Sequence, residues 1–413
     1  MSDPSPVRSV PRRALIHVGA PKTGTSFVQD VLWTHRERLA AEGILYPADR
    51  FDEHFLAALD LMELPWGGLE SQAVGAWDRL AARVRDWPGT VVVSHEILAT
   101  ASTQQVRRAL ESFGDIEVHV VPSARDLVRQ IPAEWQENVK HRRTLGYRDF
   151  LDAIMDPARE TELASWFWGV QEVPDVLDRW GSTLPPDRVH LVTVPEPGAP
   201  RDLLWHRFES VLGLGRLGLA PASGRANPSL GVPETALLRR INAQVNDGVL
   251  AGEDYRRFVR ELLAHRTLSE RVTSPRLGVP DDVRRWAAEL SAAWIDRLAE
   301  RGYDVVGSLD ELHPGPVDPR TAAFADPDRP DEVAVSGAAV QSVVTLLVEV
   351  SRLRRSEDAL SGELHAAYEE LERSRGTWFR VKRRLVLAAA EHRVAACGLA
   401  AYRRVRGRSS RSA

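Results

Sequence analysis

The chain has 413 residues, of which 43% are hydrophobic and 27% charged, and its net charge at pH 7 is −4. This composition excludes a chain that is disordered throughout, and the length allows a full core and a second unit. A single cysteine, Cys397, excludes an intrachain disulfide and a cysteine-rich zinc site. The sequence shows neither the apolar segment of a secretory signal nor a membrane-spanning stretch, so we expect a cytoplasmic protein.

The first unit predicted along the chain is a strand, a loop and a helix. The apolar run 14–18 ends at Gly19, the loop P-K-T-G-T-S occupies residues 21–26, and a helical pattern continues to residue 41. A loop of this kind presents backbone N–H groups and the positive end of a helix dipole to an anion. We therefore expect an anion site directly after the first strand.

The position of the lysine in this loop indicates which anion it binds. In the loop that binds nucleoside triphosphates, the lysine follows the second glycine. Here Thr25 stands after Gly24, and Lys22 lies inside the loop, where its ammonium reaches a group attached directly to a 5′-phosphate. A solvated lysine on a plain tight turn is the alternative interpretation.

Strands that alternate with helices along the next 280 residues predict an α/β domain with a mainly parallel central sheet. We expect extended segments at 44–47, 90–94, 116–121, 189–194 and 302–307. We expect helices at 70–86, 103–113 and 125–140, further helices before 189, and a largely helical region after 230. In such a sheet the ligand binds at the carboxyl ends of the strands.

The C-terminal part of the chain has three different patterns. Prolines between 312 and 330 indicate a linker. Apolar residues then recur at alternating steps of three and four from Val343 to Leu371, which predicts a coiled coil that forms a homodimer or packs on its own domain. The segment from Trp378 onward is basic and amphipathic, and it indicates either a peripheral membrane contact or a solvated helix. We thus expect a flexible tail at 1–12, an α/β domain at 13–310, a proline-rich linker at 311–335 and a helical extension at 336–413.

The loop at 21–26, and an arginine that follows a central strand, Arg125, resemble motifs of the PAPS-dependent sulfotransferase superfamily. The resemblance covers about residues 13–310. It implies a P-loop-like three-layer fold and the transfer of a sulfonate group from 3′-phosphoadenosine 5′-phosphosulfate (PAPS) to a hydroxyl of a carbohydrate, glycolipid or small metabolite. It also implies that PAPS is the co-substrate and that no metal is needed, because one lysine and backbone amides neutralise the charge.

The same resemblance implies roles for residues at the 5′ end of PAPS. Lys22 contacts the bridging oxygen and the departing phosphate. The 5′-phosphate is bound by the rest of the loop, namely Thr23, Gly24, Thr25 and Ser26.

At the 3′ end, the resemblance implies that Arg125 grips the 3′-phosphate through paired hydrogen bonds. A surface salt bridge is the alternative interpretation for this arginine. The serine that the superfamily carries eight residues later is Ala133 here, and Arg129 and Gln130 are the candidates to replace it. An Arg-Lys-Gly loop found in animal cytosolic enzymes is absent, and Arg225 is a candidate stand-in.

The general base is expected where the strand at 90–94 ends. His95 and Glu96 are adjacent there, and the superfamily uses a histidine or a glutamate at this position. Consecutive residues leaving a strand point in opposite directions, so one of the two faces the acceptor, and the other caps the helix at 103–113 or binds a loop amide. Glu96 is favoured because bacterial relatives often show a serine-x-glutamate here. The aromatic residues at 166–168 line an acceptor pocket or belong to the core.

Two other functions remain as alternatives. A P-loop kinase-like phosphotransferase would need a lysine in place of Thr25. A non-catalytic nucleotide-binding scaffold, organised by the coiled coil, would not depend on Lys22. Nucleic-acid binding is not expected, because the basic C-terminus lacks a recognisable binding fold.

Overall fold

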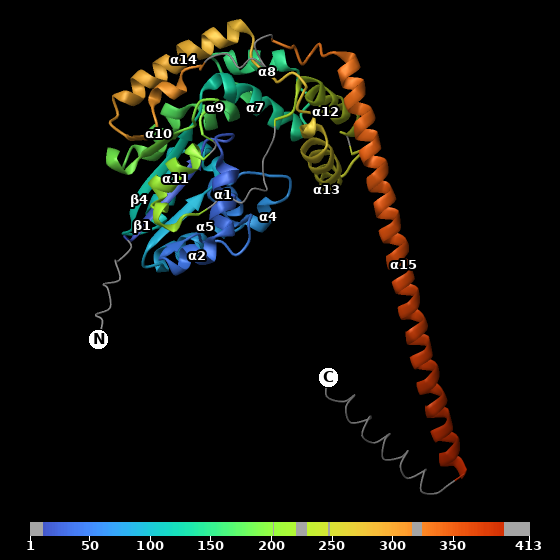
Figure 1. The fold of residues 1–413 in the computed structure, drawn as a ribbon. Helices are drawn as coiled ribbons and strands as arrows, with labels where there is room; N and C mark the ends of the chain where they lie inside the picture. Colours follow the sequence, from blue (N-terminus) through green and yellow to red (C-terminus); the bar gives the residue numbers. More distant parts are fainter. Residues whose placement is uncertain (1–10, 201, 220–228, 247, 316–323, 392–413) are drawn as a thin grey trace, which may run out of the picture. The chain divides into compact units, whose positions relative to one another are not determined.

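The computed structural model describes residues 11–200, 202–219, 229–246, 248–315 and 324–391. The chain divides into two compact units, Met1–Ser342 and Val343–Ala413. The first unit holds an α/β domain, and the second holds most of a long helix (Figure 1). The predicted tail at 1–12 and the predicted linker lie partly outside the described residues.

A six-stranded sheet with the order β2-β3-β1-β4-β5-β6 forms the centre of the first unit. Its strands are β1 (Arg13–Gly19), β2 (Ile44–Leu45), β3 (Thr90–Ser94), β4 (Glu117–Ala124), β5 (His190–Thr193) and β6 (Asp304–Val306). Every pairing in this sheet is parallel, which confirms the expected α/β class. The strands β2 and β3, which follow β1 in the chain, lie on one side of it, and the later strands β4, β5 and β6 lie on the other side. The carboxyl ends of β1, β3 and β4 therefore frame the crevice where parallel sheets bind ligands.

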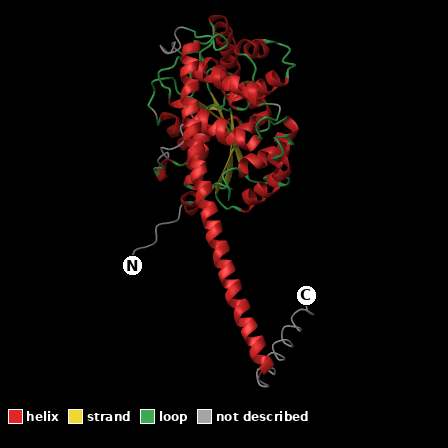
Figure 2. Ribbon diagram, turned by 90° about the vertical axis from the view of Figure 1, so that its right-hand side faces the viewer, coloured by secondary structure: helices red, strands yellow, loops and turns green. Residues whose placement is uncertain are grey.

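Helices cover both faces of the sheet (Figures 1 and 2). The α-helices are α1 (Thr25–Thr34), α2 (Arg36–Ala41), α3 (Glu53–Met62), α4 (Glu70–Ala73), α5 (Ala76–Asp86), α6 (Thr103–Ser112), α7 (Leu127–Lys140), α8 (Tyr147–Met155), α9 (Glu162–Gln171), α10 (Val173–Gly181), α11 (Leu203–Leu212), α12 (Val232–Val245), α13 (Gly252–Asp254), α14 (Asp281–Ala299) and α15 (Glu332–Glu391). Short 3₁₀ turns are η1 (Glu96–Thr100), η2 (Pro186–Arg188), η3 (Gly215–Leu217), η5 (Leu268–Glu270) and η6 (Leu309–Leu312), and η4 (Tyr255–His265) is a π-helix.

The alternation of side chains along each strand explains the two helical layers. Leu15 and Val92 point to one face, where they pack with α1 and α11. Ile16 and Val93 point to the other face, where they pack with α3, α5 and α6. Because both faces are covered, the strands are apolar at nearly every position, as in other buried parallel sheets.

Several helices and strands have other bounds in the structure than the sequence predicts. The helix expected at 70–86 is two helices, because Gly75 adopts a left-handed φ of 72° and the Asp60 carboxylate accepts the N–H groups of Gly75 and Trp77, both at 3.0 Å. The helix expected at 25–41 is likewise interrupted at residue 35, and α3 was not expected. Strand β4 runs three residues further than expected, because Ser123 and Ala124 still pair with β5.

The long helix α15 begins at Glu332 and continues to Glu391. Val335 and Ala338, in its first turns, are buried within the first unit. In the second unit, the apolar seam from Val343 to Leu371 is largely exposed, with Leu360 at 63% and Leu364 at 59%. The expectation that no segment is apolar enough to span a bilayer was wrong, because the part of α15 from Glu332 to Leu371 meets that criterion by length and composition. The basic tail beyond residue 391 lies outside the described residues.

Candidate functional site

The loop after β1 has the backbone conformation that its glycines require. Gly19 and Gly24 have φ values of 97° and 94°, and Lys22 at the tip has a φ of 62°. A Cβ on Gly19 would lie 2.8 Å from the backbone oxygen of Glu96. The glycine is therefore needed for close approach as well as for φ, and it places the end of β1 against the segment that carries the predicted base.

Hydroxyl groups secure the loop to β4. Ser123 Oγ donates to the carbonyl of Gly19 at 2.8 Å, and Thr23 Oγ1 donates to the carbonyl of Ala20 at 2.6 Å. The N–H of Ala20 donates to the Ser123 carbonyl at 2.8 Å. Burial lowers the pKa of His17 to about 4, so its neutral ring, 3.4 Å from Ser123 Oγ, adds no charge beneath the loop. The Thr23 side chain thus supports the loop, and only its backbone N–H is left for a ligand.

The start of α1 provides the anion-binding end of the loop. Gly24 precedes the helix, and no side chain caps its N-terminus. The N–H groups of Thr25 and Ser26 have no partner within the helix, as in the first turn of any α-helix. Together with the helix dipole they attract a phosphate or sulfate group.

Lys22 forms an ion pair with Glu137 of α7, with Nζ and Oε2 2.8 Å apart. The same carboxylate contacts Arg260 of η4 and His141, each at 3.2 Å. Burial alone would raise the pKa of Glu137, but His141, Lys22 and Lys140 hold it well below the usual range. Glu137 is therefore a permanent anion that holds the loop lysine. Neither Glu137 nor Arg260 was predicted as a site residue, because only the tertiary fold brings Glu137 to the loop and Arg260 to Glu137.

Arg125 lies beside the loop, as expected for a residue that binds the same ligand. Its Nη1 donates to the carbonyl of Lys22 at 3.4 Å, and its Nε has no partner among the described residues. Burial, and then the charge of Arg129, lower the pKa of Arg125 to about 10, so the guanidinium remains charged at pH 7. A buried cation with an unused donor fits a phosphate better than it fits a surface salt bridge.

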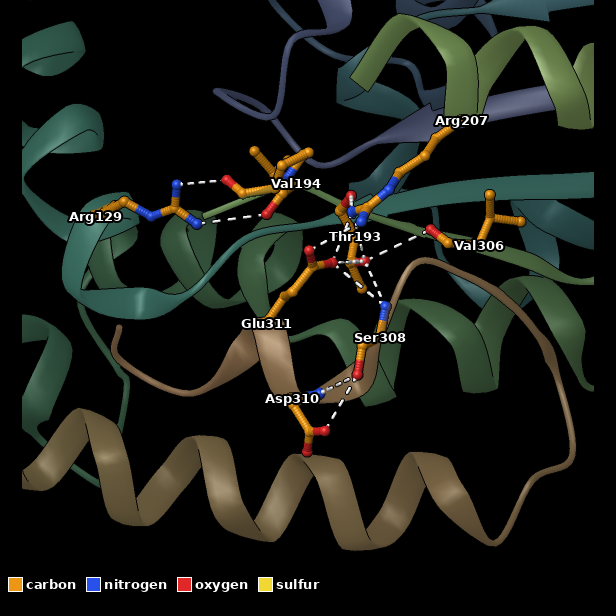
Figure 3. Close-up of polar contacts among 9 residues, drawn as sticks. Arg129, Thr193, Val194, Arg207, Val306, Ser308, Asp310 and Glu311 are labelled. Atoms are coloured by element: carbon orange, nitrogen blue, oxygen red, sulfur yellow. Dashed lines mark hydrogen bonds and ion pairs between the residues drawn. The ribbon is translucent and has the colours of Figure 1, made fainter. Parts of the chain in front are cut away.

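The guanidinium of Arg129 is hydrogen-bonded to backbone groups at the carboxyl end of β5 (Figure 3). It forms an ion pair with Asp126 and donates to the carbonyls of Val194 and of the proline that follows, at 3.4 and 2.9 Å. Arg207 and Glu311, paired at 2.6 Å, lie beside it in the same network. Since Nε and both Nη atoms have internal partners, the structure does not bring this guanidinium to the loop as a phosphate ligand.

Gln130 supports the loop from α7. Its Nε2 donates to the carbonyl of Pro21 at 2.6 Å, and its Oε1 is buried without a partner among the described residues. The side chain therefore positions the loop rather than facing solvent. Arg225, the other candidate for the 3′ end, lies outside the described residues.

His95 and Glu96 leave β3 with different partners. The Glu96 carboxylate accepts a hydrogen bond from Gln29 Nε2 of α1 at 2.9 Å. Burial alone would raise the pKa of Glu96, but His95, the residue's own backbone N–H and Gln29 bring it below the ordinary value. His95 Nδ1 accepts the N–H of Ile97 at 3.3 Å, and its ring lies 5.1 Å from that of Phe55. His95 thus caps the 3₁₀ turn η1, and Glu96 is held as an ionised carboxylate next to the loop.

A second acid near the loop was not predicted. Glu134 of α7 is buried, and its Oε2 has no partner in the described part of the chain. Burial raises the pKa of Glu134 to about 7, although the charge of Lys22 opposes this effect. At neutral pH this side chain exchanges a proton readily, close to the lysine of the loop.

The aromatic residues at 166–168 were expected either to line an acceptor pocket or to belong to the core. Phe167 and Trp168 are buried in the core formed by α7, α8 and α9. Trp166 is partly buried, and its ring lies 6.0 Å from that of Trp66. An acceptor pocket lined by all three residues is therefore wrong, because two of them have no free face.

A cavity of about 440 Å³ opens next to the loop helix. Ser26 and Gln29 line one side, and residues of η4, including Arg260, line the other. Within the described residues, no cluster of three His, Cys, Asp or Glu side chains has the arrangement of a metal site.

A comparison with protein-family models gives no match, and a comparison with curated proteins gives none. Among solved structures, the chain is similar to the crystal structure of a sulfotransferase from Alicyclobacillus acidocaldarius. The two share 17% sequence identity with a TM-score of 0.43, and the likeness covers 71% of this chain and 98% of the other. A likeness this distant concerns the course of the backbone and says nothing about substrates.

Proposed function

We propose that this chain is a PAPS-dependent sulfotransferase that transfers a sulfonate group to a hydroxyl of a carbohydrate, glycolipid or small metabolite. The observation that carries the proposal is the arrangement at the end of β1. A loop with a lysine at its tip opens onto an uncapped helix N-terminus, and it lies between a charged arginine and an ionised glutamate. This combination suits a substrate with two anionic ends and a reacting hydroxyl.

In the proposed complex, the amides of the loop and the first turn of α1 bind the 5′-phosphosulfate. Lys22 moves from Glu137 to the oxygen that bridges phosphorus and sulfur, where negative charge develops in the transition state. Arg125, with its unused Nε, binds the 3′-phosphate.

The transfer itself is an in-line displacement at sulfur. The acceptor oxygen forms a bond to sulfur while the bond from sulfur to the bridging oxygen breaks, and the bond's electrons remain on the departing phosphate. The acceptor's proton passes to the Glu96 carboxylate, which Gln29 holds in place. The products are a sulfate ester, 3′-phosphoadenosine 5′-phosphate (PAP) and a proton.

Ligand-induced stabilisation tests this proposal without knowledge of the acceptor. PAP at one hundred times its Kd is expected to stabilise the protein by about 2.7 kcal/mol, which raises the melting temperature by several degrees. ATP with Mg²⁺ is expected to produce no comparable shift. Stabilisation by ATP and Mg²⁺ but not by PAP would favour a kinase-like phosphotransferase instead. Transfer of radiolabelled sulfonate from PAPS to a fractionated extract then identifies the acceptor.

A further inference from the structure

One wall of the cavity beside α1 is formed by a π-helix. Four of its lining residues come from the π-helix η4, at steps of four, one and four: Arg256, Arg260, Glu261 and His265. The opposite side of this helix, with Tyr255 and Leu263, is buried in the domain. The wider winding of a π-helix allows residues four and five apart to share one face, and such helices are frequent at functional sites.

Two chains of contacts connect this cavity to the groups that would carry out the chemistry. Gln29 lines the cavity and donates to Glu96, the proposed base. Arg260 lines the cavity and contacts Glu137, the carboxylate that holds Lys22. A molecule in the cavity is therefore one side chain, Gln29, away from the base, and it is linked to the lysine through Arg260 and Glu137. An acceptor has to bind in this region.

The charge on this wall is positive. Burial, together with the nearby charge of Lys140, lowers the pKa of His265 to about 4, so its ring is neutral at pH 7. The two arginines then face one exposed carboxylate, that of Glu261. The negative charge of Glu137 does not fully offset the charge of Arg260, because Lys22 and His141 contact the same carboxylate. Positive charge in a concave, partly desolvated site favours an anionic ligand.

We propose that the acceptor is itself an anion: a hydroxyl compound that carries a carboxylate, phosphate or sulfate group, which Arg256 and Arg260 bind. Phe51, on the rim of the same cavity, provides an apolar face for the part of the acceptor between its two polar ends. This inference rests on the proposed function, because it places the acceptor rather than the nucleotide in the cavity.

Binding of matched acceptor pairs to the PAP-loaded, full-length protein tests the inference by calorimetry. The pairs are 4-nitrophenyl β-glucuronide with the corresponding glucoside, 4-hydroxyphenylacetate with its methyl ester, and a galactoside 6-phosphate with the unmodified galactoside. Within at least one pair, the acidic member is expected to bind 10-fold or more tightly, as a charge-assisted hydrogen bond provides. Arg260→Gln is expected to bring that ratio close to one. Arg257→Gln, on the same helix but not in the cavity wall, is the control and is expected to leave the ratio unchanged.

The outcomes separate this inference from the proposed function. If wild-type protein does not bind PAP, the proposed function fails. If PAP binds, but both members of every pair bind equally or none binds at 10 mM, only the inference fails. Loss of PAP binding in Arg260→Gln would also overturn it, because the arginine would then belong to the nucleotide.

Discussion

Lys22 is held by Glu137 in the absence of substrate, and the proposed reaction requires that this contact be exchanged for one to the bridging oxygen. The exchange is favourable because Glu137 keeps Arg260 and His141 when the lysine leaves. If Glu137 had no other partner, the departure of Lys22 would leave a carboxylate unpaired inside the protein and would cost free energy. The other partners of Glu137, Arg260 and His141, therefore have a function at the scale of single residues: they free the lysine for the substrate.

Replacing Lys22 with alanine is expected to lower kcat for sulfonate transfer by about 10²- to 10³-fold, as does the loss of one stabilising donor in other enzymes. Folding should hardly change, since both partners of this ion pair are partly exposed and such pairs contribute about 0–1 kcal/mol. Initial rates with PAPS and the melting temperature are the measurements. Arg50→Gln, which breaks an exposed ion pair with Asp52, is the control. Full activity of Lys22→Ala would overturn the role assigned to this lysine, whereas no sulfonate transfer by the wild-type protein would support the scaffold alternative.

The base is identified by comparing Glu96→Gln with His95→Gln. Glu96→Gln is expected to lower kcat by about 10²- to 10⁴-fold, because the acceptor proton then has no carboxylate to accept it. His95→Gln should have a smaller effect, since its ring binds a backbone amide.

The pH profile gives an independent check on the same assignment. A base works only when deprotonated, and the pKa of Glu96 lies below its ordinary value of 4.5. The value of kcat/KM should therefore stay level from pH 8 down to about pH 5 and fall only in more acidic solution. A larger loss in His95→Gln than in Glu96→Gln would assign the base to the histidine.

At the scale of elements, α7 connects the two halves of the site. Asp126 caps its N-terminus by accepting the N–H of Arg129 at 3.0 Å. Gln130, Glu134 and Glu137 follow at steps of four and three, so they share one face of the helix, and that face is turned towards the loop. The helix was expected, but of this face only Gln130 was predicted to take part in a nucleotide site, and a support for Lys22 was not expected.

Glu134 makes the stability of this helix depend on pH. Its pKa is about 7 in the folded protein and ordinarily 4.5, so the folded state holds the proton more tightly than the unfolded chain does. Stability therefore decreases as pH rises from 4.5 through 7. The difference of about 2.5 units corresponds to roughly 3 kcal/mol above pH 7.

Glu134→Gln is expected to remove this dependence, because the amide cannot ionise. In urea titrations the variant should be more stable than wild type at pH 8 and similar to it at pH 4.5. Glu162→Gln, at an exposed position of α9, is the matched control and should leave both values unchanged. A variant that is less stable than wild type at pH 8 would contradict the raised pKa.

At the scale of the whole molecule, the exposed seam of α15 is the largest feature without a partner among the described residues. In the later heptads of the seam, the first core position holds Glu357, Leu364 and Leu371. In the first two heptads, valine at 343 and 350 and leucine at 346 and 353 place a β-branched residue at one core position and leucine at the other. This combination favours two-stranded, parallel coiled coils. A second copy of α15 is the partner that this pattern suits best.

The full-length protein is therefore expected to have about twice its chain mass of 45.9 kDa in light scattering. The double variant Val350→Glu and Leu360→Glu should be monomeric, because charges would face each other in the seam. Arg355→Glu, which lies outside the seam, should remain dimeric. A wild-type monomer that floats with phosphatidylglycerol vesicles would instead identify α15 as a membrane segment, which its length and composition allow.

The sequence by itself determined the local elements and the class of fold. Runs such as 14–18 and 90–94 are apolar at most positions, which indicates a strand covered on both faces. The loop at 21–26 required an anion site, because its glycines and the following helix leave backbone amides open. Only the tertiary structure decided which side chains face that site. Glu137 reaches Lys22 across 115 residues, and Arg260 reaches Glu137 across 123. Arg129 turns to β5, although it is only four residues from Arg125. Local propensity sets the conformation of a segment, but the partner of a charged side chain depends on how distant segments pack, and no local pattern records that.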